Sequence, residues 1–145
     1  MTGETYYTSA TIPGDAVTGV WTDWTPVCSA ATTAPATSNS GRYTQIGKCI
    51  CAWFKINFTG SAGSGRYWVS VPVLGVYGPD QISGYGWLYD SSAQQLVTYD
   101  SRFDVDGTKI GLYRGGTTNY TVGDNNPWVW ANGDVIFGQL NYEAV

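Results

Sequence analysis

The sequence predicts an all-β protein, an antiparallel β-sandwich or jelly roll of about eight to ten strands with an extended N-terminal arm. Composition is the first observation behind this prediction. The 145 residues include 19 Gly, 7 Trp and 11 Tyr, and aromatic residues favour pleated surfaces while glycine supplies turns. The second observation is that turn signals separate short apolar runs about every 8 to 12 residues. The third is the uninterrupted alternation of residues 48–59.

The N-terminal segment differs from the rest of the chain. Residues 1–20 are polar, rich in Thr and Gly, and interrupted at Pro13, a composition typical of turns and extended segments. We therefore expect an arm at 1–20, with one candidate strand at 5–12, followed by a β-sandwich domain at 21–145. A chain of this length fits a single domain.

The strands of the domain are inferred from the turn signals between them. We expect a strand at 20–28, a long Ala-, Thr- and Ser-rich loop at 29–40, and then a hairpin of strands 42–46 and 48–59 joined at Gly47. Further strands are expected at 66–73, with an exit from the sheet at Pro72, and at 85–90, 95–99, 109–114 and 134–143. Short strands in this number are typical of antiparallel sandwiches.

The strand at 48–59 has one face that is apolar throughout. That face carries Ile50, Ala52, Phe54, Ile56 and Phe58. The opposite face changes along the strand, from Cys49, Cys51 and Trp53 to Lys55, Asn57 and Thr59. Successive side chains of a strand point to opposite faces, so we expect the first face to be core. The second face should be covered only at its start, which places Trp53 in the core.

Charge and hydropathy exclude two classes of partner. The formal net charge is −4, and the seven Lys and Arg residues are spread singly, so there is no basic patch for nucleic acid. No apolar run has the length of a transmembrane helix, and residues 1–5 lack the basic start of a signal peptide. We expect a soluble protein made in a cytoplasm, with neither nucleic acid nor membrane as a partner.

Residues with catalytic or metal-binding chemistry are scarce. The chain has no His, which excludes Ser-His-Asp and Cys-His arrangements and removes the commonest metal ligand. Nearly all carboxylates that could act in glycoside hydrolysis stand beside Gly, Ser, Asn or Pro, where turns account for them. They are Asp80, Asp90, Asp100, Asp104, Asp124 and Asp134. We expect no catalytic residue, no metal site, no cofactor and no enzymatic activity.

Two motifs resemble metal sites without meeting their requirements. The spacing of Cys49 and Cys51 is shorter than that of structural zinc sites. The run from Asp104 to Gly107 resembles the start of a calcium loop, but its twelfth position is Gly115 in place of Glu. A hairpin turn between the flanking strands explains the same residues.

The three cysteines, Cys28, Cys49 and Cys51, are an odd number. Cys49 and Cys51 are neighbours on one face of a strand, too far apart for a relaxed disulfide. We expect buried thiols. The alternative is a bridge from Cys28 to Cys49 or Cys51.

The seven tryptophans exceed what the core of such a domain needs. Surplus aromatic rings are typical of interfaces, where a flat body is buried and a polar group still finds a partner. Trp128 and Trp130 should share one face of an extended segment that follows a loop signal at 125–127. If exposed, this pair is a candidate site for a ligand or an interface.

Several motifs from about residue 20 to the C-terminus carry a family resemblance. They are Trp21-Thr22-Asp23-Trp24-Thr25-Pro26, Gly41-Arg42-Tyr43 with Ile46-Gly47-Lys48, Gly65-Arg66-Tyr67 leading into Ser70-Val71-Pro72-Val73, and the closing Trp130-Ala131-Asn132-Gly133-Asp134-Val135 and Tyr142-Glu143-Ala144. Together they resemble a β-domain of virion proteins of tailed bacteriophages. In that family the domain commonly ends minor tail proteins and tail fibres, and similar domains occur as small head-surface proteins. The chain departs from the family at its three cysteines.

The resemblance implies a virion surface protein. No long fibre or coiled-coil segment precedes the domain, so we expect a capsid decoration protein that binds the major capsid protein as a homo-oligomer, a trimer. The candidate subunit or capsid contacts near the arm are then Tyr6, Tyr7, Trp21 and Trp24. The alternative is a receptor-binding tip of a tail fibre or minor tail protein, in which Trp128 and Trp130 bind a host surface glycan.

Overall fold

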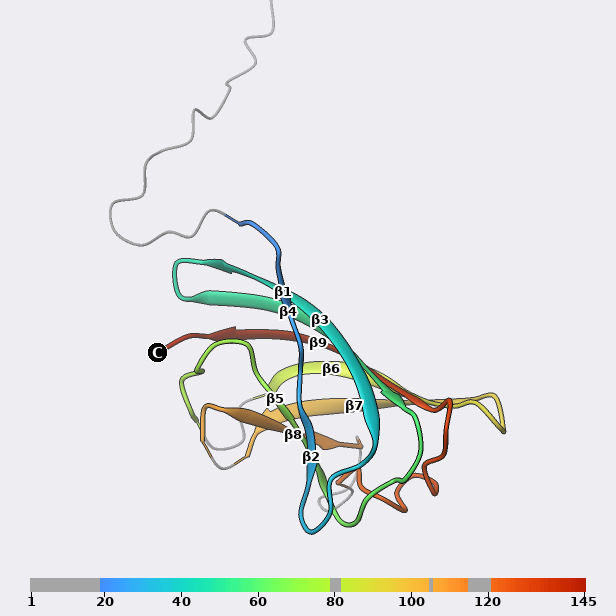
Figure 1. The fold of residues 1–145 in the computed structure, drawn as a ribbon. Helices are drawn as coiled ribbons and strands as arrows, with labels where there is room; N and C mark the ends of the chain where they lie inside the picture. The colour runs from blue at the N-terminus through green and yellow to red at the C-terminus, as the bar shows by residue number, and fades with distance from the viewer. Residues whose placement is uncertain (1–18, 79–81, 105, 115–120) are drawn as a thin grey trace, which may run out of the picture.

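The computed structural model describes residues 19–78, 82–104, 106–114 and 121–145. Within these ranges, nine strands form one antiparallel sheet in the order β1-β3-β4-β9-β6-β7-β8-β5-β2 (Figure 1). The strands are β1 (Thr22–Trp24), β2 (Cys28–Ala30), β3 (Thr37–Ile46), β4 (Cys49–Phe58), β5 (Tyr67–Ser70), β6 (Ile82–Asp90), β7 (Gln95–Phe103), β8 (Lys109–Tyr113) and β9 (Val135–Glu143). The described residues contain no helix. The prediction of an all-β antiparallel fold is confirmed.

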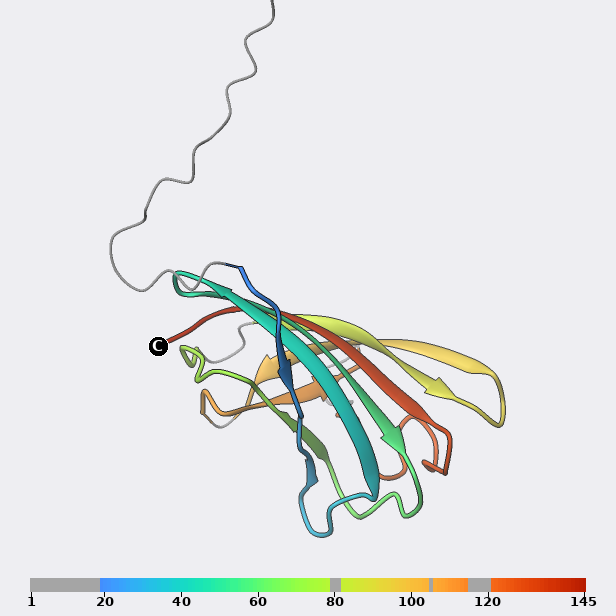
Figure 2. The same ribbon diagram turned by 45° about the horizontal axis from the view of Figure 1, so that its top comes forward.

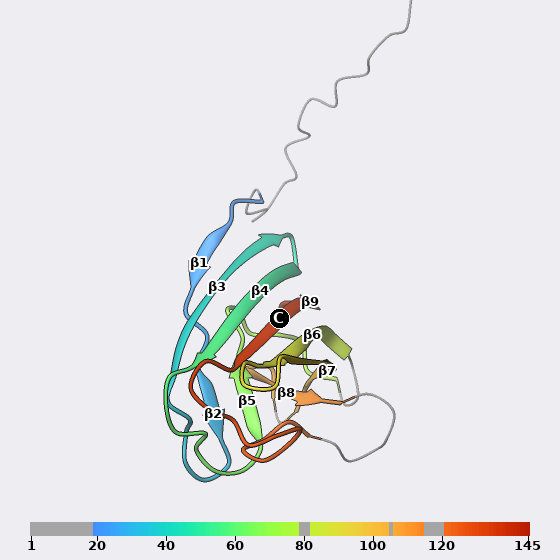
Figure 3. The same ribbon diagram turned by 90° about the vertical axis from the view of Figure 1, so that its right-hand side faces the viewer.

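The sheet curls until its two edges approach each other. β1 and β2 are separated by only three residues in the chain, yet they are the two outermost strands of the sheet. The link between them, residues 25–27, is hydrogen-bonded to strands near both edges. The side chain of Asn39 in β3 donates a 2.9 Å hydrogen bond to the Pro26 carbonyl, and the amide of Ser70 in β5 donates a 3.0 Å hydrogen bond to the Val27 carbonyl. The result is the half-barrel seen in Figures 2 and 3.

Glycines along one row of the sheet make room for rings on its inner face. The row runs by register from Gly41 to Phe54, Gly138, Gly86 and Tyr99, on β3, β4, β9, β6 and β7. A Cβ atom at Gly138 would overlap the Phe54 ring, and one at Gly86 would lie 2.7 Å from the Tyr99 hydroxyl. These rings therefore lie directly over glycine backbone, an arrangement found where strands bend or approach closely.

The core lies inside the curl. The apolar face of β4 points into it, as predicted, and Phe54 and Ile56 are almost fully buried. At the far end of β4 the Trp130 ring stacks on Phe58, with centroids 4.6 Å apart, and Tyr67 packs edge-on against Trp130. Aromatic rings thus fill the core at both the middle and the end of β4.

From the predicted strand at 42–46 onward, each predicted strand overlaps a described one, although β3 and β6 begin earlier, β5 ends at Ser70 and β7 continues to Phe103. The hairpin turns at Gly47, whose φ is 60°. The predicted strand at 20–28 is wrong in one respect: it is interrupted at Pro26, and its halves become the opposite edges of the sheet. The predicted loop at 29–40 is also shorter, because β2 extends to Ala30 and β3 begins at Thr37.

Some predicted features fall outside the described residues. These include residues 1–18, with the candidate strand at 5–12 and the candidate contacts Tyr6 and Tyr7, as well as Asp80. The N-terminal arm therefore stays a prediction. The predicted jelly roll is not confirmed, because the described strands form one curled sheet. In the described part of the chain, no helix is long and apolar enough to span a membrane.

Candidate functional site

Large aromatic rings stand exposed on the outer face of β4, β9 and β6. The side chains of Trp53, Tyr85 and Trp87 are 40%, 56% and 43% exposed. They point outward because they alternate along their strands with the inward positions of Phe54 and Gly86. Exposed rings clustered on one sheet face are typical of a binding surface.

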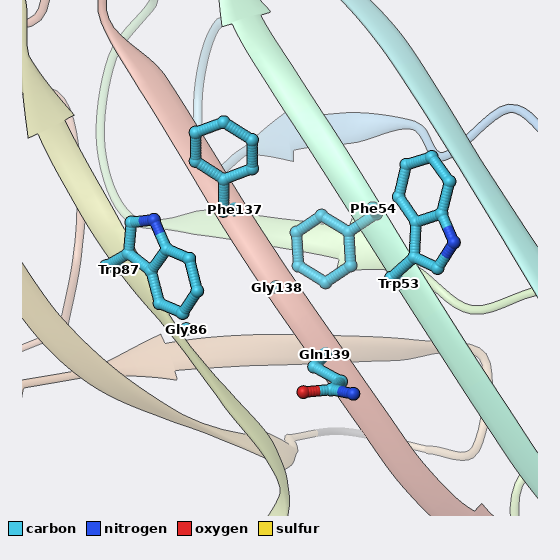
Figure 4. A pocket seen from close by; sticks show the side chains of 7 residues that line it. All are labelled: Trp53, Phe54, Gly86, Trp87, Phe137, Gly138 and Gln139. Atoms are coloured by element: carbon cyan, nitrogen blue, oxygen red, sulfur yellow. The ribbon is translucent and has the colours of Figure 1, made fainter.

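A hollow of about 150 Å³ lies between Trp53 and Trp87. It is lined by Trp53, Phe54, Gly86, Trp87, Phe137, Gly138 and Gln139, and these seven residues define the aromatic hollow. Figure 4 shows the two indoles on either side of β9, with Phe137 toward one end and Gln139 toward the other. Gly138 and Gly86 lie between the indoles at positions that face the inside of the sheet, so their backbone forms the floor of the hollow.

The walls of the aromatic hollow are apolar, Gln139 lines one end, and Lys55 lies beside the Phe137 ring at the other end. The Trp87 and Phe137 rings are 6.0 Å apart between centroids. The Lys55 ammonium lies 5.4 Å from the Phe137 centroid, a cation–π distance, and has no carboxylate partner among the described residues. Gln139 is exposed at the other end. The hollow can therefore contact an apolar ring face and hydrogen-bond to polar groups at the edge of the ring.

The predicted pair Trp128 and Trp130 does not form an exposed site. Trp130 is 3% exposed, and its indole N–H donates a 2.8 Å hydrogen bond to the Gly123 carbonyl. Trp128 is half-buried beside it, while Val129 between them is 75% exposed. The prediction that both indoles share a face is correct. The expected exposure is wrong, because that face points into the core.

The other two described contact candidates, Trp21 and Trp24, differ in how far they are buried. Trp21 is exposed, while Trp24 is half-buried and packs edge-on against the Phe54 ring, with centroids 6.1 Å apart. Trp24 therefore contributes to the core. Next to Trp53 on the outer face, Arg42 forms a 2.9 Å ion pair with Asp23, which joins β1 to β3.

Sequence reasoning missed the aromatic hollow. It placed Trp53 in the core, but no described layer covers the outer face of β4. A signal was present in β6, where Tyr85, Trp87 and Tyr89 alternate with Gly84, Gly86 and Leu88. A strand in which aromatic residues alternate with glycines carries its rings on one face. Its other face has few side chains and allows close packing by neighbouring groups.

The cysteines are all free thiols. Burial raises the pKa of the Cys28 thiol from 9.0 to about 12, so this thiol stays protonated. Cys49 is exposed and Cys51 is half-buried. Burial, then the neighbouring Cys49, raises the pKa of Cys51. The prediction of buried thiols is confirmed for Cys28 and wrong for Cys49, and the alternative bridge to Cys28 is not formed.

The candidate calcium loop is a hairpin turn between β7 and β8, as favoured from the sequence, with Phe103 paired to Ile110. Asp106 accepts a 2.8 Å hydrogen bond from the Thr108 amide. Asp104 forms an ion pair with Arg66 at 3.1 Å and accepts a hydrogen bond from Tyr113. No group of three or more potential metal ligands occurs among the described residues.

A second exposed apolar cluster lies at the end of the molecule that contains the β3–β4 turn and the C-terminus (Figure 1). Ile46, Leu74, Val76 and Val145, which we call the aliphatic end, are each 40% to 72% exposed. Backbone bonds hold this region together: the Val76 amide donates to the Glu143 carbonyl at 2.8 Å, and the Val145 amide to the Leu74 carbonyl at 3.1 Å. The aliphatic end is thus a fixed surface.

Comparison of the chain with protein-family models, with curated proteins and with solved structures found no match.

Proposed function

We propose that this protein is a non-enzymatic structural protein of a bacteriophage virion, a capsid decoration protein that binds the major capsid protein as a trimer. The aliphatic end is the observation that carries this proposal. Four exposed aliphatic side chains lie on hydrogen-bonded backbone near one end of the sheet, and exposed apolar surface of this kind is typical of a site that another protein covers.

The size of the aliphatic end indicates what else the contact needs. A stable protein interface buries about 800 Å² on each partner, and four side chains supply only part of that area. The N-terminal arm, residues 1–20, is proposed to supply more of it by lying across neighbouring subunits.

The edge of the sheet offers a place for such an arm. β1 pairs only with residues 41–43 of β3, so residues 44–46 of β3 have no strand neighbour on that side among the described residues. An extended segment of another chain can pair with an open edge through backbone hydrogen bonds. Arm exchange at β1 and β3 would join subunits without a large apolar core.

Variants of the aliphatic end test the proposal. The double change Leu74→Glu and Val76→Glu should release the protein from purified heads, because buried unpaired carboxylates oppose association. Val129→Glu is the matched control, since Val129 is 75% exposed and precedes β9, whose first residue pairs with Asn57 at the end of β4 away from the β3–β4 turn.

The copy number of the protein in purified virions distinguishes a position on the head from a position in the tail. Decoration predicts roughly hundreds of copies per particle, whereas a tail protein is present in a few to a few dozen. A low copy number, or a Leu74→Glu, Val76→Glu protein that still binds heads, would contradict the proposal.

The second candidate function is receptor binding, as the glycan-binding tip of a tail fibre or minor tail protein. The aromatic hollow favours it, with Trp53 and Trp87 in place of the predicted Trp128 and Trp130. In this case, changes in the hollow should reduce host adsorption while particle composition stays normal.

A further inference from the structure

We propose that the aromatic hollow binds a single pyranose ring of a glycan. This inference deepens the second candidate function, glycan binding, and rests on it. It uses the glycan-binding part of that candidate function, and it does not depend on the aliphatic end.

The size of the hollow fits one ring. Its volume is about 150 Å³, and a cavity of this size in another protein accommodates benzene, a six-membered ring. Pockets for larger ligands have volumes of about 300 to 1,000 Å³. The part of a ligand that fits inside the hollow is therefore about the size of one monosaccharide unit.

The lining matches the two-sided chemistry of a pyranose. A pyranose has apolar C–H groups on its ring faces and hydroxyl groups around its edge. Trp53 and Trp87 offer flat apolar surfaces on two sides of the hollow. At its ends, the Gln139 amide and the Lys55 ammonium can donate hydrogen bonds to hydroxyl oxygens, and the Gln139 carbonyl can accept one.

The site is held in shape before any ligand binds. Its floor is the backbone of β9 and β6 at Gly138 and Gly86, which the inner rings fix from below. The Trp87 ring packs beside Phe137, and Lys55 lies near that same ring. A preorganised site loses less conformational entropy on binding, although contacts with a single ring still give weak affinity.

Weak single-site affinity is compatible with a role in attachment. One monosaccharide in an open hollow is expected to bind with a dissociation constant of about 1 mM or weaker. Several copies on one assembly would bind a repetitive glycan far more tightly, because each later contact is intramolecular.

Indole N–H signals of the full-length protein test the proposal. The chain has seven tryptophans, so their ¹H–¹⁵N signals can be assigned by single substitutions. The probes are methyl glucopyranoside, methyl galactopyranoside, N-acetylglucosamine and rhamnose, each at about 100 mM, well above the expected dissociation constant. At least one sugar should shift the Trp53 and Trp87 signals and leave the buried Trp130 signal in place.

Matched variants separate the hollow from other exposed rings. Trp87→Ala should reduce the shift of the Trp53 signal at least tenfold at equal sugar concentration, and Gln139→Ala should weaken it. Trp21→Ala removes an equally exposed indole outside the hollow and should leave the titration unchanged.

Three outcomes would overturn the proposal. They are no shift of either signal with any of the four sugars, an undiminished Trp53 shift in Trp87→Ala, and loss of self-association in Trp87→Ala, which would assign the face to a contact between copies. Sugar titration in solution and copy number in virions are independent measurements. Failure of the ring site is therefore distinguishable from failure of the decoration role.

Discussion

The two faces of the sheet use aromatic rings differently at the same row of glycines. On the inner face, the rings of Phe54 and Tyr99 are 1% and 2% exposed and lie over glycine backbone. On the outer face, Trp53 and Trp87 lie beside the same glycines and are about 40% exposed. The inner rings hold the curl together, whereas the outer rings remain available for a partner.

The largest effect is expected from removing an inner ring. Phe54→Ala should lower the free energy of unfolding by about 3 to 5 kcal/mol, because it leaves a cavity against Trp24 and Gly138. Asn57→Ala, further along β4 and half-buried, should change it by about 0.5 kcal/mol or less. Urea denaturation measures both, and equal small effects would mean that the inner and outer faces are reversed.

The next largest loss of stability is expected when a side chain is added under the Phe54 ring. Gly138→Ala places a Cβ atom against the Phe54 ring, and overpacking of this kind costs about 1 to 3 kcal/mol. Gly60→Ala is the control, because its added Cβ would meet only Ala36 at an ordinary 3.5 Å. A Gly138→Ala protein as stable as the control would show that the inner rings do not need the glycine row.

Alkaline pH should destabilise the fold through Cys28. Burial raises the pKa of this thiol from 9.0 to about 12, so the unfolded chain loses the proton first as pH rises. The contribution of the protonated Cys28 thiol to the free energy of unfolding is complete below pH 9.0 and falls as the pH rises toward about 12. Burial also raises the pKa values of Tyr67 and Tyr142, which act in the same direction above 10.0.

Two variants isolate the thiol. Between pH 9 and 10, the free energy of unfolding of Cys28→Ala should depend less on pH than that of the parent chain. Cys49→Ala, which changes an exposed thiol, should keep the parent dependence. If the free energy of unfolding of Cys28→Ala depends on pH as steeply as that of the parent chain, the alkaline destabilisation does not come from Cys28.

Much of the fold was predictable because alternation and turn residues are local signals. The pattern of β4 identified its buried face, and Gly47 identified the hairpin turn. The sequence could not show that the segment at 20–28 divides at Pro26 between two sheet edges, because closure of the curl depends on contacts with Asn39 and Ser70, far along the chain.

The candidate site was less predictable, because alternation shows that residues share a face and not which face is covered. Trp128 and Trp130 share a face that points into the core, and Trp53 stands on a face that no described layer covers. The hollow itself depends on the register of three strands, which brings together Trp53, Phe137 and Trp87. Only long-range pairing places those rings side by side.

The most direct test of this division between faces is the free energy of unfolding of Trp53→Ala, measured by urea denaturation beside that of Phe54→Ala. The two rings are consecutive on β4 and point to opposite faces. We expect Trp53→Ala to cost about 1 kcal/mol or less, with the Phe54→Ala cost several times larger. A Trp53→Ala cost of about 3 kcal/mol or more would show that the outer rings are structural, and would contradict the assignment of that face to binding.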